Sequence, residues 1–92
     1  MIRSFACQDT ADFFAGKRVK GFVNIAAVAS RKLAQLDAAA RLSDLASPPN
    51  NRLKPLVGDR LGQHSIRIND QYRICFVWRE DGPHEVEITD YH

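Results

Sequence analysis

The last three residues of the chain, Asp90, Tyr91 and His92, are of the types that general acid–base chemistry uses. They follow a segment in which Val86 and Ile88 alternate with polar residues. Because side chains two positions apart on a strand share a face, a regular strand places Asp90 and His92 at the end of that apolar face. A carboxylate beside an imidazole orients the ring and favours its protonated form, which can donate a proton. The alternative interpretation is a polar chain end that is simply solvated.

Positive charge is concentrated in the middle of the chain. The net charge is only +2, but residues 1–51 carry seven basic and four acidic side chains (+3), residues 52–79 six and two (+4), and residues 80–92 none and five (−5). A basic segment of this kind suits a phosphate-rich partner. It is equally compatible with the solvated face of a sheet, so charge alone leaves both interpretations open.

Composition excludes several classes of protein. With 92 residues, 45% hydrophobic and 26% charged, the chain is expected to fold as one domain over residues 1–92. Two cysteines, Cys7 and Cys75, support neither a disulfide scaffold nor a structural zinc site, and His64 and His84 stand apart from other metal-ligand types. The N-terminus has no apolar leader, and no apolar run approaches the ~20 residues of a membrane span. We therefore expect a soluble, cytoplasmic protein without metal, cofactor or membrane contact.

The first half of the chain has the pattern of helices. A short strand is expected at residues 2–5, followed by a short helix capped by Asp9 or Thr10. Apolar residues then recur at intervals of three and four, which predicts a helix over residues 22–37 with Lys32 on its solvent side or margin. A weaker helical turn around residues 42–45 must stop at the following prolines.

The second half has the two-residue period of strands. Strands are expected at residues 65–68, 72–78 and 84–91, joined by short turns into an antiparallel meander. Phe76 and Trp78 share a face of the second of these strands and are expected in the core. Helices followed by strands predict an α+β fold, with the N-terminal helices packed on an antiparallel sheet.

Four pieces of sequence, in this order along the chain, resemble the HigB-type toxins of the RelE/ParE superfamily of bacterial toxin–antitoxin systems. They are NRLKPLVGDR (residues 51–60), GQHSIRIN (62–69), YRICF (72–76) and the terminal DYH (90–92). No single piece is diagnostic, but the ordered set is. The resemblance spans essentially the whole chain and implies the small RelE-like fold.

The same resemblance implies an activity and its partners. Proteins of this type are ribosome-dependent endoribonucleases that enter the A site and cleave messenger RNA without a metal, thereby inhibiting translation. They are neutralised by a helix-turn-helix antitoxin encoded beside them (HigA-like), through which alone they reach operator DNA. We therefore expect an antitoxin, the ribosomal A site with its messenger, and a bacterial cytoplasmic location.

The resemblance also implies which residues act. Asp90, Tyr91 and His92 match the catalytic tail of the family, and Arg73 matches an arginine near the start of a strand. Lys54 departs from the pattern, because many relatives have a histidine in this context. An ammonium stabilises the negative charge of a phosphorane well but is a poor base. The identity of the base therefore stays open.

Metal-free cleavage is compatible with these residue types, because RNA carries its own nucleophile, the 2′-hydroxyl. We assign His92 as general acid or base, Asp90 as its orienter, and Tyr91 as a stacking or proton-relay group. Arg73 and Lys54 are assigned as phosphate clamps. The expected RNA-binding residues are Arg52, Arg60, Arg67, Lys17, Arg18 and Lys20, although for the last three a solvated loop is at least as good an interpretation.

Two other functions remain open. A ParE-like toxin of the same fold would inhibit DNA gyrase by protein contact and cut nothing, which the terminal Asp90, Tyr91 and His92 argue against. A non-enzymatic RNA-binding module would contact phosphates with its basic sheet without turning them over. Lys54 keeps the second possibility open.

Overall fold

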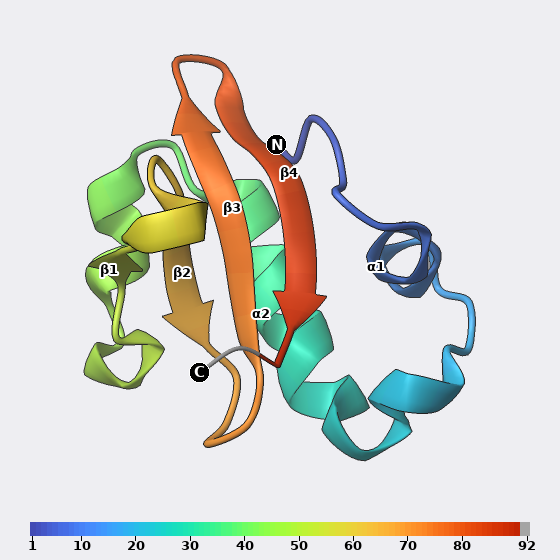
Figure 1. Ribbon diagram of the computed structural model, residues 1–92. Helices are drawn as coiled ribbons and strands as arrows, with labels where there is room; N and C mark the ends of the chain where they lie inside the picture. The colour runs from blue at the N-terminus through green and yellow to red at the C-terminus, as the bar shows by residue number, and fades with distance from the viewer. Residues whose placement is uncertain (91–92) are drawn as a thin grey trace.

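The computed structural model describes residues 1–90 as two layers, with helices packed on an antiparallel sheet (Figure 1). The sheet has four strands in the order β1-β2-β3-β4, so each pairs with its neighbour in sequence. This confirms the predicted α+β class. In chain order the elements are α1 (Gln8–Phe14), the 3-10 helix η1 (Lys20–Ile25), α2 (Ala26–Ala38), the 3-10 helices η2 (Leu42–Ala46) and η3 (Pro49–Asn51), β1 (Lys54–Pro55), the 3-10 helix η4 (Gly58–Arg60), β2 (His64–Arg67), β3 (Arg73–Arg79) and β4 (Gly82–Thr89).

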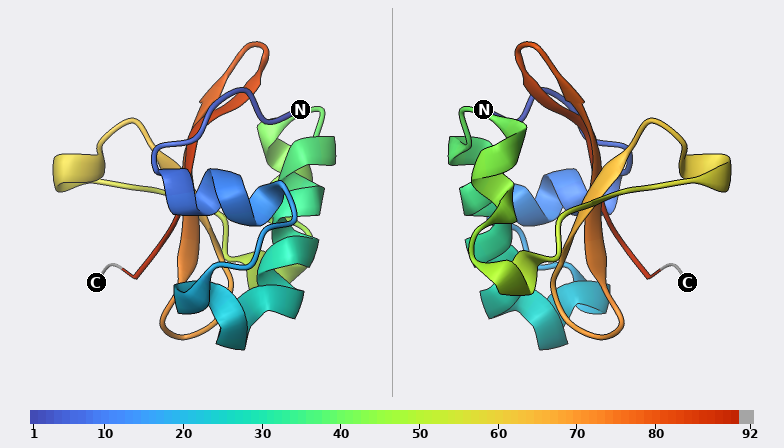
Figure 2. Two further views of the ribbon diagram at one scale, coloured as in Figure 1. Left: turned by 90° about the vertical axis from the view of Figure 1, so that its right-hand side faces the viewer. Right: turned by 90° about the vertical axis from the view of Figure 1, so that its left-hand side faces the viewer.

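The register of the sheet separates an apolar face from a polar one. Directly paired residues of an antiparallel sheet point to the same side. Ile66, Ile74 and Ile88 form one such row and are all buried. The alternate positions point to the other side, which neither α1 nor α2 covers (Figures 1 and 2). We call this side the open face of the sheet.

Helix α2 covers the apolar face because its apolar residues recur with the helical period. Ala29, Leu33 and Leu36 are at most 1% exposed and belong to the same core cluster as the strand isoleucines. Fully burying one leucine side chain contributes about 1.5–3 kcal/mol to stability. Among residues 1–90, no helix is both long enough and apolar enough to cross a membrane.

The outer edge of β4 is closed by the N-terminal residues and by α1. The Arg3 amide donates to the Pro83 carbonyl at 2.9 Å, and the Val86 amide donates to the Ser4 carbonyl at 3.0 Å. Further along, the Ile88 amide donates to the hydroxyl of Thr10, which lies wholly buried on α1, at 3.0 Å. Unpaired edge groups invite aggregation, so these contacts protect the sheet.

Some predicted boundaries are wrong in the N-terminal half. The strand expected at residues 2–5 is reduced to a single bridge between Phe5 and Val86, because that segment runs along the edge of β4 only briefly. The helix expected over residues 22–37 begins as the 3-10 helix η1 and becomes α-helical only from Ala26. Lys32, expected on the solvent side of this helix or at its margin, is only 7% exposed.

The strand half agrees better with the prediction. β2 and β3 lie within one residue of the expected strands, and Phe76 is fully buried while Trp78 packs against the core. β4 begins two residues early, and the expected end of that strand at residue 91 lies outside the described residues. The prediction missed β1, which is only two residues long and contains a proline.

A substitution at Gly82 tests the close contact between β4 and the N-terminal residues. At Gly82 φ is +124°, and a Cβ there would lie 2.7 Å from the Met1 carbonyl oxygen. At Gly62 φ is +94°, and an added Cβ would meet no atom within 4 Å apart from those of Gly62 and its two chain neighbours. We expect Gly62→Ala to lower the free energy of unfolding by about 1–2 kcal/mol from backbone strain alone. Gly82→Ala should lower it by more, as measured by urea denaturation, and equal losses would contradict the close approach of Met1.

Candidate functional site

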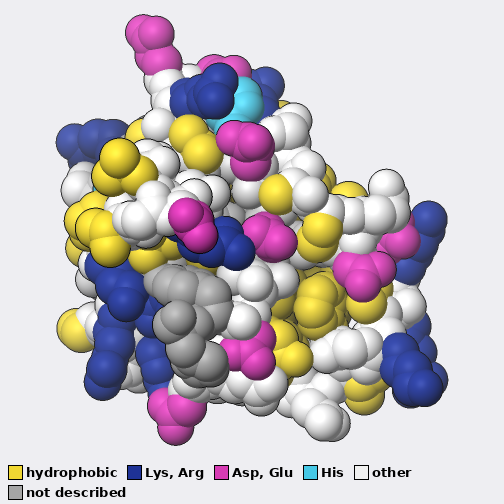
Figure 3. Space-filling view, viewed as in Figure 1, with side chains coloured by type: hydrophobic (Ala, Val, Ile, Leu, Met, Phe, Trp, Pro, Cys, Tyr) yellow, Lys and Arg dark blue, Asp and Glu magenta, His cyan; other side chains and the backbone are white. Residues whose placement is uncertain are grey.

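A hollow of ≈ 290 Å³ lies at the β1–β2 side of the open face, and we call it the basic hollow. Its lining contains four cationic side chains and a single acidic one. Lys and Arg side chains gather over the same part of the sheet in Figure 3. The lining residues are Arg52, Lys54, Arg67, Asn69, Asp70, Gln71 and Arg73.

Strand pairing brings these residues together from distant parts of the sequence. Arg67 pairs directly with Arg73 across β2 and β3, so both guanidinium groups start from the same row of the open face. Lys54 on β1 pairs with Ser65 on β2 and joins the same face. Like charges opposite each other on a sheet are destabilising. An anion bound between them would remove that repulsion.

Arg73 is held in place by two hydrogen bonds. Its Nε donates to the Ser65 hydroxyl at 2.7 Å, and its terminal nitrogen donates to the Arg52 carbonyl at 2.8 Å. A guanidinium fixed in this way needs little reorganisation when it meets an anion, which is what electrostatic stabilisation of a transition state requires. Arg73 is therefore a positioned cation, and its assignment as a phosphate clamp stays a prediction.

The other two arginines of the hollow differ in how they are engaged. Arg67 donates to the carboxylate of Asp70, whose side chain is fully exposed. The guanidinium of Arg52 is exposed and has no partner among residues 1–90. Because surface ion pairs contribute little, the Arg67–Asp70 pair can open to admit another anion.

A buried polar network fixes the edge of the hollow, and sequence reasoning missed it. Asn51 is fully buried, accepts a hydrogen bond from the Lys32 ammonium and donates to the Leu45 carbonyl at 3.1 Å and to Gln35 Oε1 at 3.0 Å. Burial lowers the pKa of Lys32, and the charges of its arginine neighbours act in the same direction. Arg52 follows Asn51 directly, so this network ties the hollow to α2.

Arg60 lies on the open face but is not part of the basic hollow. It donates to Glu87 at 3.2 Å and to Gln63 at 3.1 Å. Beneath it, Cys75 is fully buried, and burial raises the pKa of its thiol to about 11. Cys75 is therefore an unreactive part of the packing. Arg60 is absent from the lining of the basic hollow, although the charges of Arg60, Arg73 and Lys54 all act on the Cys75 thiol.

Asp90 lies next to the basic hollow. Its carboxylate is exposed and accepts a hydrogen bond from Gln71, a residue of the hollow, at 3.1 Å. The expected partner of Asp90 was His92, which together with Tyr91 lies outside the described residues. The roles assigned to these two residues therefore stay predictions.

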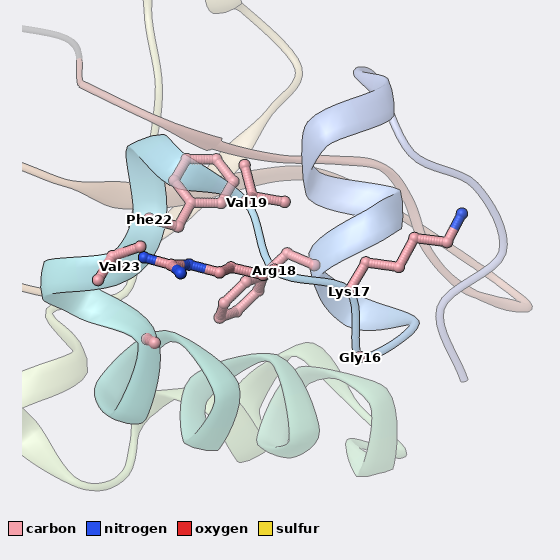
Figure 4. A pocket seen from close by; sticks show the side chains of 8 residues that line it. Gly16, Lys17, Arg18, Val19, Phe22 and Val23 are labelled. Atoms are coloured by element: carbon pink, nitrogen blue, oxygen red, sulfur yellow. The ribbon is translucent and has the colours of Figure 1, made fainter.

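The remaining cationic group is elsewhere in the molecule. Lys17, Arg18 and Lys20 occupy the connection between α1 and α2, and the first two line a different, mainly apolar hollow (Figure 4). Their expected contact with RNA, and the alternative of a solvated loop, both stay predictions.

Within residues 1–90, neither His64 nor His84 lies in a cluster of potential metal ligands. In the described part of the chain, no group of three or more His, Cys, Asp and Glu residues could hold a metal ion. The imidazole of His84 instead pairs with Asp81 at 2.6 Å, and this hydrogen bond lowers the pKa of the carboxyl.

These features define a small α+β protein with a cationic hollow on the open face of its sheet. A solved structure of the YoeB–YefM complex from Staphylococcus aureus has a similar fold, with a TM-score of 0.59 and 19% sequence identity over 100% of this chain and 95% of the other. That fold is the RelE-like fold expected from the sequence.

The sequence profile of a family described as the RelE-like toxin of type II toxin–antitoxin system HigB matches residues 4–92. The chain belongs to this HigB-like toxin family. It is 54% identical over 48 residues to Toxin HigB-1 of Vibrio cholerae, covering 52% of this chain and 50% of that protein. It is also 36% identical over 58 residues to an uncharacterised protein of Haemophilus influenzae, covering 63% and 57%. The matches thus span about half the length of these relatives.

The buried network predicts that two adjacent asparagines respond differently to mutation. Asn51→Ala leaves the Lys32 ammonium and a buried carbonyl unpaired, so we expect the free energy of unfolding to fall by about 2–4 kcal/mol. Asn50 is exposed, and Asn50→Ala should change it by no more than about 0.5 kcal/mol. Chemical denaturation checks both values. A loss in Asn51→Ala no larger than in Asn50→Ala would show that the network does not support the hollow.

Proposed function

We propose that the protein is the toxin of a type II toxin–antitoxin system and acts as a ribosome-dependent, metal-independent endoribonuclease on messenger RNA. The observation that carries this proposal is the convergence of four cationic side chains in the basic hollow, next to Asp90. Membership of the HigB-like toxin family supports the same conclusion. Because it acts on ribosomes, the protein would work in the bacterial cytoplasm.

The basic hollow would hold the phosphate that is cleaved. The 2′-hydroxyl of the preceding nucleotide attacks that phosphate in line, a pentavalent phosphorane forms, and the bond to the 5′-oxygen of the next nucleotide breaks. The products are a 2′,3′-cyclic phosphate and a free 5′-hydroxyl. Arg73, already oriented by Ser65, would stabilise the added negative charge, and Lys54 would act beside it as a second clamp.

Proton transfer is assigned to the end of the chain. A base must remove the proton of the 2′-hydroxyl and an acid must protonate the departing oxygen. His92 is proposed for one of these steps, with Asp90 orienting it and Tyr91 stacking on a base or relaying a proton. The position of Asp90 beside Gln71 supports this assignment, because it places the proposed orienting carboxylate at the rim of the hollow.

The rim of the hollow would contact the flanking nucleotides. Arg52 can bind a phosphate without giving up a partner among the described residues. Arg67 can bind one by exchanging its ion pair with Asp70 for the phosphate.

The ribosomal A site would present the messenger in an extended form that the hollow can reach. A helix-turn-helix antitoxin is the proposed inhibitor, and operator DNA would be met only through it.

Cleavage of a messenger on translating ribosomes tests this function. Relative to wild type, we expect Arg73→Gln to lower the cleavage rate by about 10²-fold or more and His92→Gln by about 10²–10⁴-fold. Arg79, an exposed arginine on the same strand as Arg73, provides the matched control, and Arg79→Gln should cleave like wild type. Circular dichroism confirms that each variant is folded.

The same assay distinguishes the rival functions. No cleavage by the wild type would contradict the nuclease and favour a gyrase inhibitor or a non-enzymatic RNA-binding module. Efficient cutting of free RNA without ribosomes would contradict the proposed dependence on the A site.

A further inference from the structure

A second hollow of ≈ 330 Å³ lies where α1, η1 and the start of α2 meet, and we call it the apolar hollow (Figure 4). It shares no lining residue with the basic hollow. In its floor the rings of Phe13 and Phe22 pack edge to face, with their centroids 5.6 Å apart. The lining residues are Phe13, Gly16, Lys17, Arg18, Val19, Phe22, Val23 and Ala26.

The rim of the apolar hollow combines an exposed aliphatic side chain with positive charge. Val23 is 45% exposed, one of the more exposed large hydrophobic residues of the described chain. The side chain of Arg18 extends across toward Val23, whereas that of Lys17 points away (Figure 4). Lys17 pairs with Asp12 at 3.7 Å, but Arg18 and Lys20 are exposed and have no partner among residues 1–90.

The chemistry of the lining favours a protein segment over RNA. Bases bind to proteins by stacking on open aromatic faces. Here Phe22 is only 8% exposed and the two rings contact each other, so the hollow offers mainly aliphatic surface. Protein interfaces combine an apolar, well-packed centre with a polar or charged rim, and the apolar hollow has this arrangement. Arg18, the lining cation without a partner among residues 1–90, favours an acidic partner.

We propose that the apolar hollow is the docking site for an acidic, amphipathic segment of the antitoxin. One aliphatic side chain of that segment would fill the space between Val19, Phe22 and Val23, and an adjacent carboxylate would pair with Arg18. The inference rests on the proposed function, because it takes the antitoxin as the partner. It adds a place of contact that is separate from the RNA site.

The test compares two pairs of variants for binding to the purified product of the adjacent antitoxin gene, by isothermal titration calorimetry. Val23→Asp puts a carboxylate at the mouth of the hollow, and Val57→Asp makes the same change at a valine that is 81% exposed on the β1–β2 loop. Arg18→Glu reverses the charge at the hollow, and Arg31→Glu does so at an exposed position of α2. We expect Kd to rise about tenfold or more for the first variant of each pair and to stay near wild type for the second.

Three results would overturn the proposal: no binding by the wild-type protein, equal effects within each pair, or a change in self-association of the free protein caused by Val23→Asp. The last result would identify a second copy of the chain as the occupant.

The cleavage assay on translating ribosomes separates failure of this proposal from failure of the proposed function. Val23→Asp should cleave like wild type, so absence of cleavage in the wild type would refute the nuclease without deciding where the antitoxin binds.

Discussion

The central constraint on the site is that four positively charged side chains are held close together on one face of the sheet. Arg67 and Arg73 are cross-strand partners, and Arg52 and Lys54 reach the same hollow, in which Asp70 is the single acid. Among the described lining residues Asp70 balances only part of this charge, so an anion can bind there favourably. In the proposed function a phosphodiester would supply that anion, and bound phosphate would offset the mutual repulsion of the arginines.

The scaffold around the hollow keeps those cations from separating. Asn51, fixed by Lys32 and Gln35 of α2, determines where the chain enters β1. The Arg52 carbonyl that follows accepts a hydrogen bond from Arg73 and so joins the two sides of the hollow. Buried polar groups of this kind stabilise the fold only when all their hydrogen-bond partners are present. The geometry of the basic hollow therefore depends on the packing of α2.

Much of the fold could be predicted from the sequence, but the positions of several site residues could not. A period of 3.6 residues before the prolines and 2 after them identified the helices and the three longer strands. β1 was missed because a strand of two residues is too short to show an alternating pattern. The burial of Lys32 was missed because its hydrogen-bond partner Asn51 lies 19 residues away. Arg60, Lys17, Arg18 and Lys20, which were expected to bind RNA, do not line the basic hollow, and the sequence alone could not show this.

The most direct test of the central claim is the salt dependence with which the protein binds a short single-stranded RNA that 2′-O-methylation makes resistant to cleavage. The slope of log K against log salt concentration counts the phosphates that cations neutralise, at about 0.7 per phosphate for a single strand. We predict that Arg52→Gln reduces the magnitude of this slope by roughly that amount. Arg31→Gln should leave it unchanged. An identical slope for wild type and Arg52→Gln would contradict the assignment of the basic hollow as the phosphate site.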